Sequence, residues 1–165
     1  MSKLDAPTLD FATQHPEATR ELGFRIGRAL LPGDVICLQG DLGAGKTTFV
    51  QGIAQGWGSI DAVSSPTFIL VNVYRQGSQG QLFHMDAYRL DSVPEAEELD
   101  LETMLAQGAL LIEWPERLGQ LVPDERLWIT FEHNGPTDRM LRAEAKGARA
   151  AALLDALRSN DNGEL

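Results

Sequence analysis

One short glycine-rich segment carries the residue types that bind phosphate. Residues 40–47 read Gly-Asp-Leu-Gly-Ala-Gly-Lys-Thr and match the pattern G-x-x-x-x-G-K-[ST] at every fixed position. Glycines let the backbone curl so that successive N–H groups point at phosphate oxygens, and a helix that begins near Lys46 directs its positive dipole end at the same anion. Lys46 would neutralise the β- and γ-phosphates of a nucleotide, and the Thr47 hydroxyl would bind Mg²⁺.

The flanking elements favour this interpretation over a chance glycine-rich turn. The apolar run 35–38 predicts a strand buried on both faces, and the apolar residues between Phe49 and Trp57 recur at helical spacing. A strand before the loop and a helix after it form the context that the phosphate-binding pattern requires. We therefore predict nucleotide contacts from Asp41, Leu42, Gly43, Ala44, Gly45, Lys46, Thr47 and Thr48.

A nucleotide-bound Mg²⁺ usually needs an acid at the end of a neighbouring strand, and two residues could supply it. Asp86 follows the apolar residues 82–85, and Glu113 follows 109–112. His84 shares the strand face of Asp86 and could orient it, although a packed, hydrogen-bonded histidine is commoner. The spacing leaves open which acid binds metal and which positions water. The candidate catalytic residues are thus Lys46, Asp86 and Glu113, and the candidate metal ligands are Thr47, Asp86 and Glu113.

The elements that must position these residues alternate between strands and helices. This order predicts one α/β domain over residues 1–165, with three α/β/α layers and a mixed, mainly parallel sheet that includes an antiparallel hairpin. The core spans about residues 8–158, and the tail 160–165 is expected to fray. Strands are predicted at 7–12, 35–38, 68–74, 81–85, 109–112, 127–131 and 140–145. Four helices are predicted: one that begins at Pro16, one that follows the glycine-rich loop, one at 91–107 and one at 148–158.

Composition limits the classes of function. The 165 residues hold 24 acidic and 14 basic side chains, a net charge of −10, which weighs against binding of nucleic acid by this chain alone. A single cysteine, Cys37, excludes a disulfide within the chain and favours the cytoplasm. Apolar runs of four or five residues are too short to cross a membrane. The acidic residues between Glu95 and Glu102 predict a solvated helix face that could also serve as a docking surface.

Four segments together resemble a known family. They are GDLGAGKTT at 40–48, SSPTF at 64–68, HMDAYRL at 84–90 and EWP at 113–115, and they occur in this order at compatible spacing. The chain resembles the TsaE (YjeE) family over residues 8–145. That family comprises small bacterial P-loop ATPases needed to make threonylcarbamoyladenosine in tRNA. The fold implied by the resemblance is a single P-loop NTPase domain.

The resemblance implies ATP and Mg²⁺ as cofactors, with Thr47 and Glu113 at the metal and Asp86 close by. It places Thr67 in a switch-like loop at 65–67, Trp114 beside the nucleotide, and Arg139 near it. The implied partners are TsaB and TsaD, with tRNA bound only indirectly and no membrane involved. Hydrolysis would reset that complex, and because the motifs contain no arginine finger, we expect slow hydrolysis by the free chain and acceleration by partners.

Three other functions fit a phosphate-binding loop. A small-molecule kinase commonly closes an arginine-rich lid, but residues 91–107 contain no arginine or lysine. A GTPase would need a guanine-reading Asn-Lys-x-Asp segment, which this sequence lacks, so adenine is favoured. A binding module that holds nucleotide without hydrolysing it remains an alternative from another class.

Overall fold

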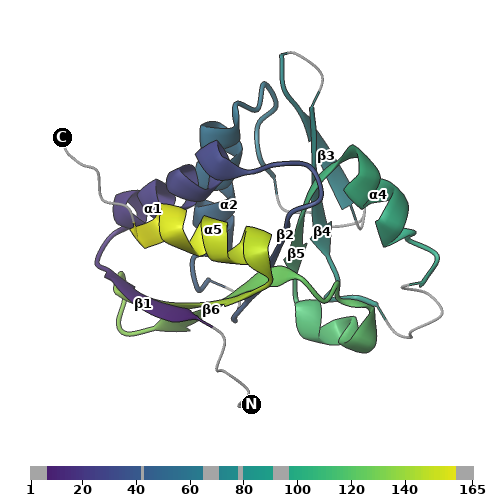
Figure 1. Cartoon of the computed structure of the whole chain (residues 1–165). Helices are drawn as coiled ribbons and strands as arrows, with labels where there is room; N and C mark the ends of the chain where they lie inside the picture. The colour runs from purple at the N-terminus through teal and green to yellow at the C-terminus, as the bar shows by residue number, and fades with distance from the viewer. Residues whose placement is uncertain (1–6, 42, 65–70, 78–79, 91–96, 159–165) are drawn as a thin grey trace.

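A seven-stranded sheet forms the centre of the protein (Figure 1). The computed structural model describes residues 7–41, 43–64, 71–77, 80–90 and 97–158. The strand order is β1-β7-β6-β2-β5-β4-β3. The strands are β1 (Thr8–Thr13), β2 (Val35–Gln39), β3 (Val71–Arg75), β4 (Gln81–Asp86), β5 (Gly108–Glu113), β6 (Arg126–His133) and β7 (Arg139–Lys146).

Parallel pairing is confined to the middle of the sheet. β6, β2, β5 and β4 run parallel to one another, whereas β1, β7 and β3 pair antiparallel at the two sides. The continuous apolar runs explain the centre, because every residue of β5 is buried and β2 is buried from Val35 to Leu38. The predicted mixed sheet and its antiparallel hairpin, formed by β3 and β4, are confirmed.

Helices cover both faces of the sheet, which confirms the three predicted layers. Figure 1 shows α1 (Pro16–Ala29), α2 (Lys46–Trp57) and α5 (Ala148–Arg158) on one side and α4 (Leu101–Gln107) on the other. Two short 3₁₀ turns at 115–117 and 119–121 complete the second side. Alternate residues of β2 enter the two apolar cores, with Ile36 on the α1 side and Cys37 on the α4 side. Within the described ranges, no helix combines the length and hydropathy needed to cross a bilayer.

The single acidic helix predicted over residues 91–107 is wrong in its extent. Among its described residues, Glu97 is helical, residues 98–100 are not, and α4 begins only at Leu101, because Asp100 has a left-handed backbone (φ 55°) that an α-helix cannot continue. The Asp100 carboxylate instead caps α4 and accepts hydrogen bonds from the amide and hydroxyl of Thr103. Residues 91–96, the start of the predicted strand at 68–70 and the tail from 159 lie outside the described residues.

α1 and α2 pack closely because glycines lie where they cross. A Cβ on Gly27 would fall on the carbonyl oxygen of Ile53, and one on Gly52 would fall on the carbonyl oxygen of Arg20. Only hydrogen fits at either position, so the two backbones approach more closely than side chains would allow. Since α2 begins at the end of the phosphate-binding loop, this contact fixes the direction of the helix that follows the loop.

Replacing Gly52 with alanine is expected to lower the free energy of unfolding by about 2 kcal/mol, as overpacking of a core typically does. In a helix without such a contact the same change would stabilise by about 1 kcal/mol through helix propensity, so the sign is diagnostic. Urea denaturation followed by circular dichroism measures the effect. Gly77→Ala is the control, because a Cβ there meets no atom within 4 Å. A Gly52→Ala variant as stable as the wild type would contradict the close contact.

Candidate nucleotide-binding site

The phosphate-binding loop connects β2 to α2. Gly43 (φ 81°) and Gly45 (φ 106°) have left-handed backbones, which the loop needs in order to turn into the helix. Gly45 is the N-cap of α2; among the described residues no side chain caps this end, and the first turn contains no acidic residue. The end of α2 therefore suits an anionic ligand held by backbone amides and the helix dipole.

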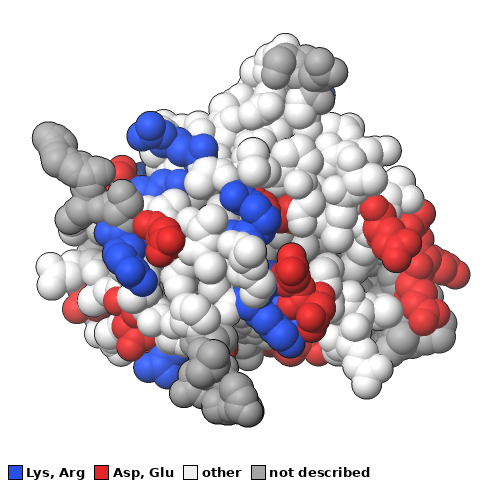
Figure 2. Space-filling model, in the orientation of Figure 1, with Lys and Arg blue, Asp and Glu red and all other residues white. Residues whose placement is uncertain are grey.

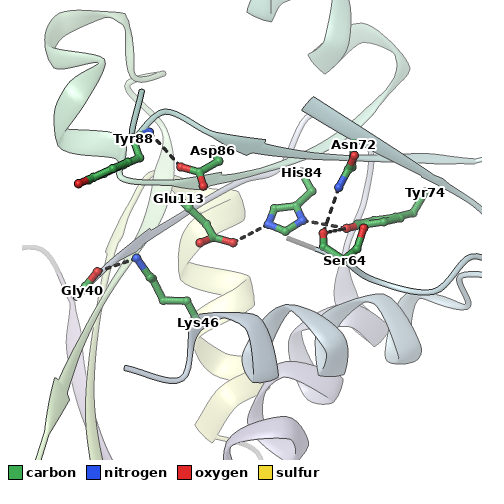
Figure 3. Close-up of polar contacts among 9 residues, drawn as sticks. All are labelled: Gly40, Lys46, Ser64, Asn72, Tyr74, His84, Asp86, Tyr88 and Glu113. Atoms are coloured by element: carbon green, nitrogen blue, oxygen red, sulfur yellow. Dashed lines mark hydrogen bonds and ion pairs between the residues drawn. The ribbon is translucent and has the colours of Figure 1, made fainter. Parts of the chain in front are cut away.

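Lys46 lies buried in the first turn of α2, with only 4% of its surface exposed. Its ammonium group donates a 2.6 Å hydrogen bond to the Gly40 carbonyl and lies 4.5 Å from the ring centroid of Trp114. Burial lowers the pKa of Lys46, and the carboxylates of Glu113 and Asp86 oppose that shift. The lysine thus lies within the electrostatic influence of both predicted acids, and a phosphate would compete with the Gly40 carbonyl for its ammonium group (Figure 3).

Both predicted acids end neighbouring parallel strands. Asp86 of β4 and Glu113 of β5 are register partners, so their side chains leave the same edge of the sheet. Glu113 is buried, and one oxygen of Asp86 accepts a 2.9 Å hydrogen bond from the Tyr88 amide. The structure brings the three candidate residues Lys46, Asp86 and Glu113 together at one edge of the sheet (Figure 3).

His84 contacts Glu113 and not Asp86. Its Nε2 lies 2.6 Å from Glu113 Oε2, and its Nδ1 lies 2.9 Å from the Tyr74 hydroxyl. From the sequence, His84 could orient Asp86 or be a packed, hydrogen-bonded residue, and nothing in the pattern pointed to Tyr74. The sequence signals for His84 were its position two residues before an acid at a strand end and its place at the start of the HMDAYRL segment.

Trp114 forms one wall of the site. Its backbone is left-handed (φ 59°), a conformation that costs energy outside glycine and that concentrates at functional sites. This turn, directly after Glu113, brings the indole ring against Lys46. Two further side chains extend this wall. The ring centroids of Tyr88 and Trp114 lie 4.9 Å apart, and Arg117 Cζ lies 5.2 Å from the Tyr88 ring centroid. Tyr88 lies within the HMDAYRL segment at 84–90 but received no predicted role there, and no motif pointed to Arg117.

Arg139 reaches the loop from the start of β7. Its Nη2 donates a 3.1 Å hydrogen bond to the Gly43 carbonyl, and its Nη1 contacts carbonyls of the 135–138 turn. The remaining predicted contacts follow the loop: Asp41 and Gly43 are exposed, Ala44 is buried, and Thr47 and Thr48 lie in the first turn of α2. Predicted contacts at Leu42 and Thr67, with the loop 65–67, lie outside the described residues.

Replacing Asp86 with asparagine is expected to stabilise the nucleotide-free protein at neutral pH. Burial, and to a lesser extent the Glu113 charge, raises the pKa of Asp86 above its ordinary 3.8. The folded state therefore binds this proton more tightly than the unfolded chain, and stability is lost as pH rises through the raised pKa. The variant's free energy of unfolding should exceed that of the wild type by an amount that grows as the pH rises from about 4 through the raised pKa of Asp86. The difference should vanish below about pH 4.

Urea denaturation across this pH range measures the difference. Asp61→Asn is a control of opposite sign, because hydrogen bonds from Arg75 lower the pKa of Asp61 to about 2 and its charge stabilises the fold. If Asp86→Asn were less stable than the wild type at neutral pH, the ionised Asp86 carboxylate of the wild type would not destabilise the fold.

A strand, a phosphate-binding loop and a helix, with two acids at the ends of adjacent parallel strands, define a P-loop nucleotide-binding protein. The family model described as "Threonylcarbamoyl adenosine biosynthesis protein TsaE" matches residues 13–141. The chain belongs to the TsaE family.

Individual relatives agree with this assignment. A Bacillus subtilis protein named tRNA threonylcarbamoyladenosine biosynthesis protein TsaE is 39% identical over 155 residues, covering 93% of this chain and 96% of that protein. A Streptomyces coelicolor protein of the same name is 42% identical over 68% of this chain and 78% of its own length. A crystal structure of Bacillus subtilis YdiB superposes with a TM-score of 0.76 at 34% identity, covering 95% of this chain and 98% of that one.

Proposed function

We propose that this chain is a Mg²⁺-dependent ATPase that serves the biosynthesis of threonylcarbamoyladenosine in tRNA. The observation that carries the proposal is the convergence of Lys46, Asp86 and Glu113 at the uncapped start of α2. That arrangement supplies a cation for phosphate and acids for metal and water at one place. The names of the relatives point to threonylcarbamoyladenosine biosynthesis as the process. The absence of an Asn-Lys-x-Asp segment from the sequence favours ATP over GTP as the nucleotide.

The donor chemistry of the site fits Mg²⁺ bound together with a nucleotide. Among the described residues, no group of three or more His, Cys, Asp or Glu side chains forms a metal site by itself. Mg²⁺ in nucleotide sites, however, takes one or two carboxylates, with phosphates and water completing its shell. Thr47, Glu113 and Asp86 are the residues that would hold it. When bound, Mg²⁺ neutralises charge on the β- and γ-phosphates.

The residues of this chain have distinct parts in hydrolysis. Lys46 exchanges the Gly40 carbonyl for a phosphate oxygen, while backbone amides at the start of α2 hold the phosphates. Water attacks the γ-phosphorus in line as the bond to the bridging oxygen of ADP breaks, giving ADP and inorganic phosphate. Asp86 or Glu113 orients that water.

TsaB and TsaD are the proposed partners, in the cytoplasm, with hydrolysis resetting the state of their complex. Acidic side chains gather over α4 on the right of Figure 2, with no blue among them in this view. Those described there include Glu97, Asp100 and Glu102, all exposed. Such a surface can dock on a complex that is basic enough to hold tRNA.

Phosphate release with ATP and Mg²⁺, measured with and without TsaB and TsaD, tests the proposal. We expect slow release by the free chain and faster release in the complex, with GTP a poorer substrate. Equal rates with and without partners would contradict the coupling. Nucleotide binding without phosphate release would identify a non-hydrolysing module, and phosphate transfer to a metabolite would identify a kinase.

A further inference from the structure

A row of hydrogen bonds, buried from Glu113 to Tyr74 and partly buried at its Ser64 end, runs away from the phosphate-binding loop (Figure 3). Glu113 Oε2 contacts His84 Nε2 at 2.6 Å, His84 Nδ1 contacts the Tyr74 hydroxyl at 2.9 Å, and that hydroxyl lies 3.1 Å from the Ser64 carbonyl. His84 is fully buried, and Tyr74 and Glu113 are 3% and 6% exposed. We call Glu113, His84, Tyr74 and Ser64 the Glu113 network.

The chemistry of the groups assigns the protons in this row. A carboxylate only accepts hydrogen bonds, so the proton of His84 that faces Glu113 lies on Nε2. Nδ1 of a neutral ring is then an acceptor for the Tyr74 hydroxyl. Burial is the main cause that raises the pKa of Tyr74, so the hydroxyl keeps the proton that it donates. That proton has two acceptors, Nδ1 and the Ser64 carbonyl, and the carbonyl also accepts from Asn72 Nδ2 at 3.0 Å.

The sheet holds the two rings in place. His84 on β4 pairs with Asn72, and Tyr74 pairs with Leu82, so Tyr74 and His84 are diagonal neighbours on two antiparallel strands. Their ring centroids lie 5.8 Å apart. Two ring side chains fixed by packing leave the Glu113 carboxylate, which has three rotatable bonds, with one preferred direction. With His84 fully buried, water has little access to replace its hydrogen bonds.

We propose that His84 and Tyr74 are positioning residues, which hold the Glu113 carboxylate in the orientation needed at the nucleotide and fasten it to the main chain at Ser64. Ser64 directly precedes residues 65–67, which the family resemblance places in a switch-like loop. The hydrogen bonds through His84 and Tyr74 therefore couple the orientation of the Glu113 carboxylate to the position of the Ser64 carbonyl. The proposal rests on the proposed function, because it assigns Glu113 a part in hydrolysis.

Tyr74→Phe is the main test, since it removes the hydroxyl and keeps the ring. Loss of a group that orients a metal-binding side chain typically costs 10- to 100-fold in metal affinity or activity. We expect about tenfold more Mg²⁺ for half-maximal ATP hydrolysis in Tyr74→Phe and about 100-fold in His84→Ala, with the KM for ATP little changed. His84→Gln, which keeps an N–H for Glu113, should recover part of the loss. Adding Tyr74→Phe to His84→Ala should not raise the Mg²⁺ requirement further, because the His84→Ala substitution already removes the hydrogen bonds that link Tyr74 to Glu113.

Asn72→Ala is the comparison variant: Asn72 is the cross-strand partner of His84, but its side chain donates its hydrogen bond to the Ser64 carbonyl, so the substitution leaves the hydrogen bonds of His84 to Glu113 and Tyr74 in place. It should leave the Mg²⁺ dependence unchanged. Additive losses in the double variant, or an Asn72→Ala variant that behaves like Tyr74→Phe, would overturn the positioning role. Thermal unfolding of each nucleotide-free variant separates these effects from loss of the fold.

Nuclear magnetic resonance of the nucleotide-free protein gives a readout that needs no hydrolysis. Histidine ¹⁵N spectra should place the His84 proton on Nε2, and Tyr74→Phe should shift the Nδ1 resonance while leaving the proton on Nε2. A proton on Nδ1 alone would overturn the proposal. A wild-type chain with the expected spectrum but without ATP hydrolysis would contradict the proposed function and leave the network intact, so the two failures are distinguishable.

Discussion

Replacing Lys46 with alanine is expected to reduce ATP hydrolysis by about 10²- to 10³-fold, the range for loss of one preorganised group that stabilises developing charge. The ammonium group is buried at the start of α2 and is the only lysine near the two acids in the described part of the chain. The two groups that contact the ammonium, the Gly40 carbonyl and the Trp114 ring, carry no positive charge and cannot replace it. Binding of ATP should weaken as well, since the phosphates lose a cation in a partly desolvated site.

Phosphate release and titration calorimetry with ATP in magnesium buffer measure the two effects. Lys146→Ala is the matched control, because that lysine is exposed and contacts only Asp124 at 3.0 Å among described ion-pair partners. It removes the same charge and should leave both measurements unchanged. If Lys46→Ala bound and hydrolysed ATP like the wild type, the loop would not be the phosphate site.

Changing Glu113 to glutamine is expected to reduce hydrolysis by about 10²- to 10³-fold while leaving the fold intact. The amide oxygen of glutamine can still accept the hydrogen bond of His84, so the packing is preserved and only the charge is lost. The loss has a second consequence: Glu113 is the carboxylate that contributes most to raising the pKa of Lys46 against the effect of burial. In its absence Lys46 gives up its proton at a lower pH, so ATP binding by the variant should weaken at a lower pH than in the wild type.

The Mg²⁺ dependence of phosphate release, compared with that of Asp86→Asn, assigns the roles of the two acids. The variant of a direct ligand needs more Mg²⁺, whereas the variant of a water-positioning acid turns over slowly at every Mg²⁺ concentration. Glu125→Gln, an exposed position beside Gly147, controls for loss of a charge. Wild-type rates in Glu113→Gln would remove Glu113 from the site.

Local pattern predicted the glycine-rich loop and the strand and helix that flank it. A loop of this kind is encoded within eight consecutive residues, and its flanking strand and helix are encoded by apolar runs and periodicity over short windows. Asp86 and Glu113 were predictable because an acid that directly follows a buried strand must leave at the carboxyl edge of the sheet. The acidic helix was predicted too long because Asp100, an ordinary helix-surface residue in sequence, adopts a left-handed backbone.

The sequence by itself determined the phosphate-binding loop, the α/β class and the two acids, because each depends on residues close together in the chain. Only the tertiary structure decided that His84 meets Glu113, that Tyr74 links it to Ser64, and that Gly27 and Gly52 let α1 lie against α2. The physical reason is that a side chain's partners across a sheet or between helices depend on strand order, register and helix crossing. These are set by burial of the whole core, and residues adjacent in the chain do not encode them.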